Sequence, residues 1–249
     1  MRNVRRKMRR DRMVVAGIVA GGIGSRMGQN IMPKQFLDLA GKPIVVHTIE
    51  KFLVSPEIDY IVVGVHEEWI HLMNDLKEKY FKGEDRIEIV SGGCNRNETI
   101  RNIVQAAKDT YGADNDAIIV THDAVRPFLS LRIIADNVEA AKKHGVCDTV
   151  ICATDTIVQS ENQQFITDIP VRKTMYQGQT PQSFQLGLFE EVYNSMTAEE
   201  LNIVTDACKL FYLRDYKVSL VEGDVTNFKI TYPFDLKMAR TMMGENFHD

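Results

Sequence analysis

Short apolar runs alternate with amphipathic stretches from residue 14 to residue 153. The apolar runs are continuous, as in strands that are buried on both faces of a sheet. They lie at Val14–Val19, Tyr60–Val65, Ile87–Val90, Ala117–Val120 and Thr149–Ala153. The stretches between them carry apolar residues three and four positions apart, at Ile44–Phe52, Glu67–Tyr80, Glu98–Lys108 and Leu131–Lys143. This alternation predicts right-handed βαβ crossovers and an α/β fold with a doubly wound, mostly parallel Rossmann-like sheet.

The pattern changes between about Thr154 and Gln179, where two alternating segments flank a polar turn at Gln159–Gln164. Such a pattern predicts a β-hairpin arm that leaves the main body. The apolar residues of an arm need cover, either from a second copy through arm exchange or from its own active site by folding back. We expect a homodimer through the arm.

The last part of the chain returns to alternating elements. We expect helices at Leu186–Met196 and Asp206–Leu213, strands at Val218–Val221 and Phe228–Ile230, and a final helix that begins at Pro233. Proline suits the first turn of a helix because the amide hydrogen that it lacks has no partner there.

Charge is distributed unevenly along the chain. Residues 1–12 contain seven Lys or Arg and one Asp, a net +6, so a total of −4 leaves −10 for the remainder. Met13 directly precedes the first apolar run and is a possible natural start, so we interpret residues 1–12 as a basic, disordered extension. A basic tail can bind nucleic acid or acidic lipid. An acidic body repels phosphate backbones, however, so we expect neither a nucleic-acid nor a membrane partner.

Length and composition favour one domain over residues 13–249, because 249 residues with 44% hydrophobic composition suffice for one full core. No apolar run approaches 18 residues, and the start lacks the features of a secretory signal, so we expect a cytoplasmic protein. The four cysteines are scattered, which predicts reduced thiols rather than a disulfide or zinc site.

A glycine-rich segment, Ala20–Gly28, follows the first apolar run. Its small residues allow close approach of the main chain and leave backbone N–H groups for an anion such as phosphate. It is not a dinucleotide fingerprint, because Met27 stands where a glycine is needed and no acidic residue directly follows Val65. It is not a Walker loop either, since the sequence Gly-Lys-Ser/Thr is absent.

Two cations accompany this segment, Arg26 within it and Lys34 in Pro33-Lys34-Gln35. Fixed cations beside a glycine loop suit a nucleoside triphosphate, whose leaving pyrophosphate gains negative charge in the transition state. The structural alternative is a tight turn with solvated cations.

Seven motifs in order resemble the cytidylyltransferase family that includes the methylerythritol-phosphate and ribitol-5-phosphate cytidylyltransferases. The resemblance spans about Val14 to Met242. The motifs are Ala20–Met27, Pro33-Lys34-Gln35, Gly92–Thr99, His122–Pro127, Thr180-Pro181-Gln182, Thr205-Asp206 and Asn227-Phe228-Lys229. The resemblance implies transfer of CMP from CTP to a small polyol phosphate, with Mg²⁺ as cofactor.

The resemblance also implies roles for individual residues. Catalytic roles fall to Arg26, Lys34 and Lys229, the last of these at the α-phosphate. Nucleotide binding falls to Ala20, Gly21, Gly22, Gly24, Gly92, Gly93, Arg96 and Thr99, of which the last four select cytosine. The acceptor side comprises Asp123, Arg126, Thr156, Arg172 and Thr180, and Asp123 also holds the magnesium ion. For Arg96 a cap or ion pair within the loop is the structural alternative.

His122 has the residue type of a general base, but we expect it to be structural. The attacking group is a phosphate oxygen, which is already ionised at neutral pH and needs no base. Magnesium uses one or two carboxylates together with phosphate oxygens, which suits Asp123 at the end of a strand.

The acceptor follows from resemblance alone. His122–Pro127 and Met175–Phe184 are more similar to the ribitol-phosphate enzymes, so we expect D-ribitol 5-phosphate, with 2-C-methyl-D-erythritol 4-phosphate as the alternative. An alternative from another functional class is that the chain is a non-catalytic nucleotide-binding module.

Overall fold

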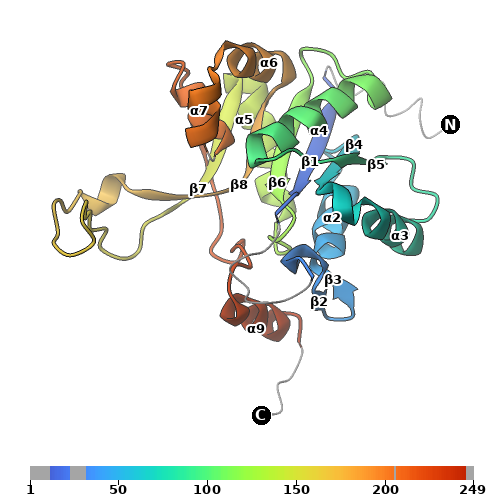
Figure 1. The fold of residues 1–249 in the computed structure, drawn as a ribbon, viewed down its shortest axis with the longest axis horizontal. Helices are drawn as coiled ribbons and strands as arrows, with labels where there is room; N and C mark the ends of the chain where they lie inside the picture. The colour runs from blue at the N-terminus through green and yellow to red at the C-terminus, as the bar shows by residue number, and fades with distance from the viewer. Residues whose placement is uncertain (1–11, 23–31, 205, 245–249) are drawn as a thin grey trace.

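A seven-stranded sheet forms the centre of the molecule (Figure 1). The computed structural model describes residues 12–22, 32–204 and 206–244. The strand order is β5-β4-β1-β6-β8-β7-β9. Four neighbouring parallel strands come from the predicted apolar runs: β1 (Val14–Ala20), β4 (Tyr60–Val65), β5 (Ile87–Ser91) and β6 (Ile118–Asp123). The predicted α/β, Rossmann-like fold is confirmed.

Helices cover both faces of the sheet. One face packs against α2 (Ile44–Val54), α3 (Ile70–Tyr80) and α5 (Leu131–His144), and the other against α4 (Arg96–Tyr111), α6 (Leu186–Ser195) and α8 (Ala207–Tyr212). The predicted helices agree with these bounds to within a few residues, except that Glu67–Trp69 forms the short 3₁₀ turn η3 ahead of α3. The apolar stripes that the sequence displays thus become two separate layers of core.

One strand of the sheet was absent from the sequence prediction. β8 (Tyr176–Gln185) lies between β6 and β7 (Val146–Cys152) and runs antiparallel to both. Its residues are mainly polar and include Pro181, features that argue against a central strand. Side chains of the neighbouring strands bond to its main chain: Thr121 Oγ donates to Gln182 O at 2.8 Å, and Thr149 Oγ donates to Pro181 O at 2.6 Å.

The predicted arm exists but is not a regular hairpin. We define the arm as residues 153–175, which project from the body where β7 ends and β8 begins (Figure 1). The arm contains one isolated bridge, Gln159 to Asp168, and the 3₁₀ turn η4 (Arg172–Thr174). Residues 176–179, predicted as the end of the arm, belong to β8.

The last part of the chain contains α7 (Ala198–Ile203), β9 (Ser219–Glu222) and α9 (Pro233–Met242). The prediction of a strand at Phe228–Ile230 is wrong. This segment is irregular, and one hydrogen bond, from Ile230 N to Val125 O at 3.0 Å, connects it to the loop after β6. Helix α9 begins at Pro233 as predicted.

The remaining short elements are η2 (Lys34–Phe36), β2 (Asp38–Leu39) and β3 (Lys42–Pro43). Within the three described ranges, none of the helices has both the length and the apolar character that a membrane span requires. The basic residues 1–11 lie outside the described residues.

Candidate active site

A pocket of about 670 Å³ lies at the carboxyl ends of β1, β4, β5 and β6. This edge is where open α/β sheets bind ligands, and the volume suits a nucleotide-sized molecule. Predicted site residues that line it are Ala20, Gly21, Gly22, Lys34, Gly92, Gly93, Arg96, Thr99, Asp123 and Lys229. Gly24 and Arg26 lie outside the described residues.

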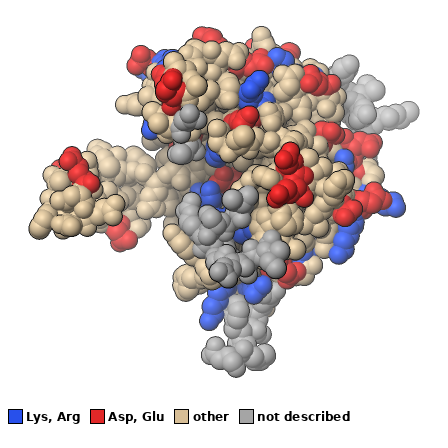
Figure 2. All heavy atoms as spheres, in the orientation of Figure 1, with Lys and Arg blue, Asp and Glu red and all other residues tan. Residues whose placement is uncertain are grey.

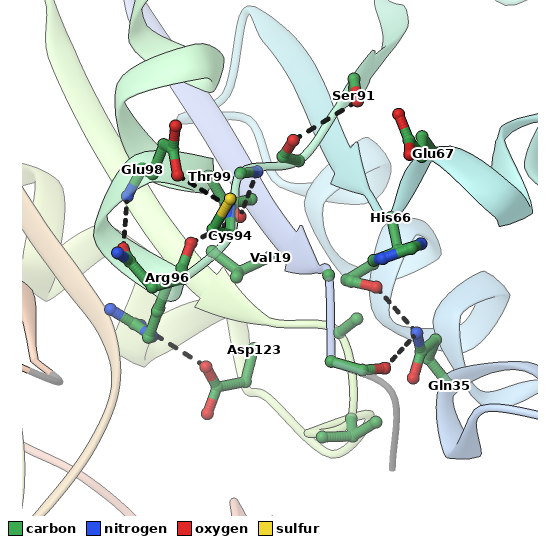
Figure 3. A pocket seen from close by; sticks show the side chains of 18 of the residues that line it. Val19, Gln35, His66, Glu67, Ser91, Cys94, Arg96, Glu98, Thr99 and Asp123 are labelled. Atoms are coloured by element: carbon green, nitrogen blue, oxygen red, sulfur yellow. Dashed lines mark hydrogen bonds and ion pairs between the residues drawn. The ribbon is translucent and has the colours of Figure 1, made fainter.

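Gln35 holds the start of the glycine loop in place. Its side chain is buried, and its Nε2 donates to Ala20 O at 2.7 Å and to Gly22 O at 3.0 Å (Figure 3). These two hydrogen bonds use the main-chain oxygens of Ala20 and Gly22 as acceptors. The sequence placed Gln35 in a motif but assigned it no role.

The segment Gly92–Thr99 forms the opposite wall and leads from β5 into α4. Asn95 caps the helix by accepting a hydrogen bond from Glu98 N at 2.9 Å, and Glu98 Oε2 accepts one from Cys94 N at 2.8 Å. A side chain at Gly93 would collide with Glu98, so the tight turn requires glycine there.

The hydroxyl of Thr99 is used inside this segment. Thr99 is buried; its Oγ accepts a hydrogen bond from Gly93 N at 3.0 Å and donates one to Asn95 O at 2.9 Å. A Cβ atom at Gly21 would lie 3.3 Å from the same hydroxyl oxygen. The two glycine-containing walls of the pocket therefore approach each other at Thr99.

Asp123, the last residue of β6, lies among three cations. Lys229 Nζ is 2.9 Å from Asp123 Oδ2, Arg96 Nη2 is 3.4 Å from Oδ1, and Arg126 Nε is 3.5 Å from Oδ2. Figure 3 shows Arg96 pointing from the start of α4 toward Asp123. One carboxylate among three cations leaves a local charge of +2, which suits a polyphosphate.

Burial by itself would raise the pKa of Asp123, but the charges of Arg96, Lys229 and Arg126 outweigh it. They hold the pKa of Asp123 well below its usual range. The carboxylate is therefore ionised at every physiological pH.

His122 is fully buried directly before Asp123, and its contacts define its tautomer. His122 Nε2 lies 3.1 Å from Arg126 O, which can only accept, so Nε2 carries the ring proton and donates it. Nδ1 of the neutral ring then accepts from the Thr180 hydroxyl at 3.0 Å, and Thr180 Oγ in turn accepts from Asp123 N at 3.1 Å. Burial lowers the pKa of His122 to about 4, so the ring is neutral at pH 7. This geometry agrees with a structural His122.

The residues predicted for the acceptor side do not gather in one place within the chain. Arg126 and Thr180 are buried beside Asp123, and their polar groups contact other protein groups. Thr156 and Arg172 are exposed on the arm, and Arg172 Nη1 donates to Thr154 O at 3.2 Å. Neither arm residue lines the pocket.

A second group of acidic residues that the sequence did not predict lies on the same sheet face as Asp123. Gln182 Nε2 donates to Asp148 Oδ1 at 3.0 Å and to Asp206 Oδ2 at 2.5 Å. The Sγ atom of Cys208 lies near both carboxylates. Burial raises the pKa of Asp148 to about 6. Because an amide N–H bridges the two carboxylates, we assign this group no metal.

Asp123 is better suited to bind magnesium than the group of Asp148, Asp206 and Cys208 is. It is a single carboxylate in a pocket with phosphate-binding character, and magnesium completes its coordination with substrate oxygens and water. The remaining lining carboxylates, Glu67 and Glu98, belong to η3 and α4, and Glu98 already accepts from Cys94 N.

Comparison with known proteins supports the nucleotide interpretation. The family model for 2-C-methyl-D-erythritol 4-phosphate cytidylyltransferase matches residues 14–245. The structure of 4-diphosphocytidyl-2C-methyl-D-erythritol synthase from Anaerococcus prevotii has a TM-score of 0.77 and 26% identity, covering 94% of this chain and 97% of that one. The 2-C-methyl-D-erythritol 4-phosphate cytidylyltransferase of Francisella tularensis has a TM-score of 0.76 and 27% identity over 92% and 99%. The Thermus thermophilus enzyme, with a TM-score of 0.69 and 24% identity over 94% and 100%, shares the fold.

Proposed function

The chain belongs to the 2-C-methyl-D-erythritol 4-phosphate cytidylyltransferase family of CTP-dependent nucleotidyltransferases, and from this premise we propose that its acceptor is 2-C-methyl-D-erythritol 4-phosphate. The observation that carries this acceptor is the family match over residues 14–245. Asp123 with its three cations at the end of β6, inside a pocket with two glycine-containing walls, supports the binding of the nucleotide phosphates. Membership in a family of enzymes also favours catalysis over a non-catalytic nucleotide-binding module.

In the proposed reaction, a phosphate oxygen of the acceptor attacks the α-phosphorus of CTP. The new phosphorus–oxygen bond forms as the bond to the β-phosphate oxygen breaks, giving a CDP-linked polyol and pyrophosphate. No proton needs to be removed from the attacking oxygen, and the neutral, fully bonded His122 suits this requirement.

Charge placement is the main contribution of the protein in this scheme. Lys229, beside Asp123, would stabilise the α-phosphate, and Lys34 with Arg26 would stabilise the leaving pyrophosphate. Main-chain groups of the Gly92–Thr99 segment would read the cytosine edges. Arg96, which pairs with Asp123 rather than within its own loop, would lie between the base and the phosphates.

Asp123 would also hold Mg²⁺ when the nucleotide is bound. The phosphates would then offer Lys229 and Arg96 new anionic partners, which frees Asp123 oxygens for the ion. The ion would supply additional positive charge at the phosphates.

The arm supports the proposal of a homodimer. Its exposed apolar side chains are Val158, Phe165, Ile166, Ile169 and Val171. Figure 2 shows the arm at the left as a mainly uncharged projection. Large apolar side chains that are exposed together on one projecting segment mark an interaction site. Because the arm projects away from its own body, Thr156 and Arg172 would reach an acceptor phosphate in the pocket of a second copy.

We expect Phe165→Glu to convert the dimer into a monomer. Phe165 is 70% exposed on the arm, and a carboxylate there would have to be buried on association. Phe234→Glu on α9 is the matched control, since Phe234 is 68% exposed and lies outside the arm. Molar mass from light scattering at micromolar concentration is the measurement. A monomeric wild type, or a dimeric Phe165→Glu, would contradict the proposal.

Ribitol 5-phosphate is a second candidate acceptor. The sequence strings noted above favour it, whereas Asp148 and Asp206 accept hydrogen bonds from Gln182 and do not line the pocket. Ribitol phosphate has more hydroxyl groups than methylerythritol phosphate and no methyl branch.

We expect pyrophosphate release with CTP and 2-C-methyl-D-erythritol 4-phosphate, and none above background with ATP, GTP or UTP. The measurement compares all four nucleotides against this acceptor, ribitol 5-phosphate and glycerol 3-phosphate. A higher kcat/KM with ribitol 5-phosphate than with 2-C-methyl-D-erythritol 4-phosphate would make ribitol 5-phosphate the preferred acceptor. Equal rates with all nucleotides would contradict the role of the Gly92–Thr99 segment.

A further inference from the structure

Lys229 lies on a segment, residues 223–230, that forms neither helix nor strand. Its side chain is 41% exposed, yet its Nζ lies 2.9 Å from the buried Asp123 carboxylate. A lysine side chain has much rotational freedom, and an irregular main chain adds more. Something other than secondary structure must therefore hold this segment in place.

Asn227, two residues before Lys229, is one of the holding groups. It is 0% exposed, and its Nδ2 donates to Thr180 O at 2.8 Å and to Gln179 Oε1 at 3.2 Å. Its main-chain oxygen accepts a hydrogen bond from Arg126 Nη1 at 2.8 Å. Asn227 thus joins the Lys229 segment to β8 and to the loop after β6.

Gln179 of β8 holds the beginning of the same segment. Its Nε2 donates to Asp224 O at 2.8 Å, and its Oε1 accepts from Asp224 N at 3.3 Å as well as from Asn227. A Cβ atom at Gly223 would collide with Gln179 Oε1 and lie 3.1 Å from the side chains of Ile151 and Thr149, so the segment passes close to both β8 and β7. Both ends of the Gln179 amide are therefore bonded to this segment.

We propose that Asn227 and Gln179 are positioning residues that fix Lys229 for phosphate transfer. The proposal rests on the proposed role of Lys229 at the α-phosphate of CTP. Neither residue lines the pocket, so both act through the main chain of residues 223–230. A displacement of about 1 Å in a positioned catalytic group can reduce a rate on the order of a hundredfold.

A double-mutant cycle between Asn227 and Lys229 tests this proposal. We expect Asn227→Ala to lower kcat by about tenfold in the otherwise wild-type enzyme, and by less than about twofold when Lys229→Ala is already present. The KM for CTP should change by less than about threefold, because the other cations and both glycine-containing walls remain.

Asn137→Ala is the matched control. Asn137 is also 0% exposed, and its Nδ2 also makes two bonds, to Ile133 O at 2.9 Å and to Thr149 Oγ at 2.8 Å, but it lies in α5 away from the pocket. Its substitution should cost similar stability, measured by thermal unfolding. Its effect on kcat should be small and the same in both backgrounds.

Equal kcat losses for Asn227→Ala in both backgrounds, or the same coupling for Asn137→Ala, would overturn the proposal. If Asn227→Ala does not fold, Gln179→Ala replaces it in the same cycle with the same expected coupling. If Lys229→Ala alone retains nearly full activity, the proposed role of Lys229 fails instead, and the single variant shows this before the cycle is closed.

Discussion

Lys34→Ala should reduce kcat/KM for CTP on the order of a hundredfold and leave the fold intact. Lys34 begins η2 and lines the pocket beside Gly21 and Gly22. A cation at this place would stabilise the charge that gathers on the leaving pyrophosphate. Removing one charged contact from a desolvated site costs roughly 3 kcal/mol of transition-state stabilisation. The measurement is initial-rate pyrophosphate release, with circular dichroism as the test of folding.

Lys42→Ala is the control for this variant. Lys42 lies nearby in the chain and pairs with Glu50 at 2.6 Å, but it does not line the pocket. An exposed pair of this kind contributes little, so both activity and stability should change only slightly. Near-normal turnover by Lys34→Ala would remove the main support for a triphosphate at the glycine loop.

The parallel half of the fold could be predicted from sequence because one signal dominates there. A strand buried on both faces, such as Tyr60–Val65, must be apolar throughout, and its helical neighbours must carry one apolar stripe. The signal is local, so no knowledge of tertiary contacts is needed.

β8 could not be predicted in the same way, because the hydrogen-bond partners of its polar residues lie far away in the chain. Gln182, for example, receives a bond from Thr121 on β6 and donates to Asp148 on β7. A chain of polar residues around a proline has the local character of a loop. The opposite error occurred at Phe228–Ile230, where two apolar residues around Lys229 indicated a strand. Ile230 N bonds instead to Val125 O in the loop after β6, and it is the side chain of the neighbouring Asn227 that bonds to β8.

The candidate site likewise has one part that the sequence predicts and one part that it does not. The glycine segments and Asp123 follow strands directly, so their place at one edge of the sheet follows from sequence. The convergence of Arg96 and Lys229 on Asp123 does not, because these cations lie 27 and more residues away in the chain. Arg96 therefore had an ion pair within its own loop as its alternative, whereas the structure pairs it across two elements.

Asp123→Asn should have the largest combined effect of any single substitution in the site. Asp123 is 7% exposed and is the common partner of Arg96, Arg126 and Lys229. Without its charge, three neighbouring cations repel one another with no anion between them. Removing one partner of a buried ion pair typically costs about 3–5 kcal/mol, because the remaining charge is uncompensated. We expect a clear fall in the unfolding temperature and loss of turnover by at least about a hundredfold.

Glu190→Gln provides the comparison for stability. Among the residues that the structure describes, Glu190 pairs with Lys108 alone, at 2.7 Å, and both side chains are about one-third exposed. Loss of such a partly exposed pair should cost at most about 1 kcal/mol. A destabilisation of Asp123→Asn no larger than that of Glu190→Gln would show that the three cations do not depend on Asp123.

CTP should restore part of the stability that Asp123→Asn loses, and this distinguishes a phosphate site from a purely structural ion cluster. The phosphates of the nucleotide would supply the missing negative charge to Lys229 and Arg96, so binding energy would appear as stability in proportion to RT ln(1 + [CTP]/Kd). Unfolding temperatures are measured with and without CTP, in the absence of Mg²⁺ so that the metal ligand is not itself under test. We expect CTP to raise the unfolding temperature of Asp123→Asn more than that of Glu190→Gln. If CTP raises both unfolding temperatures equally, the triphosphate binds away from Asp123 and the cluster around this residue is structural.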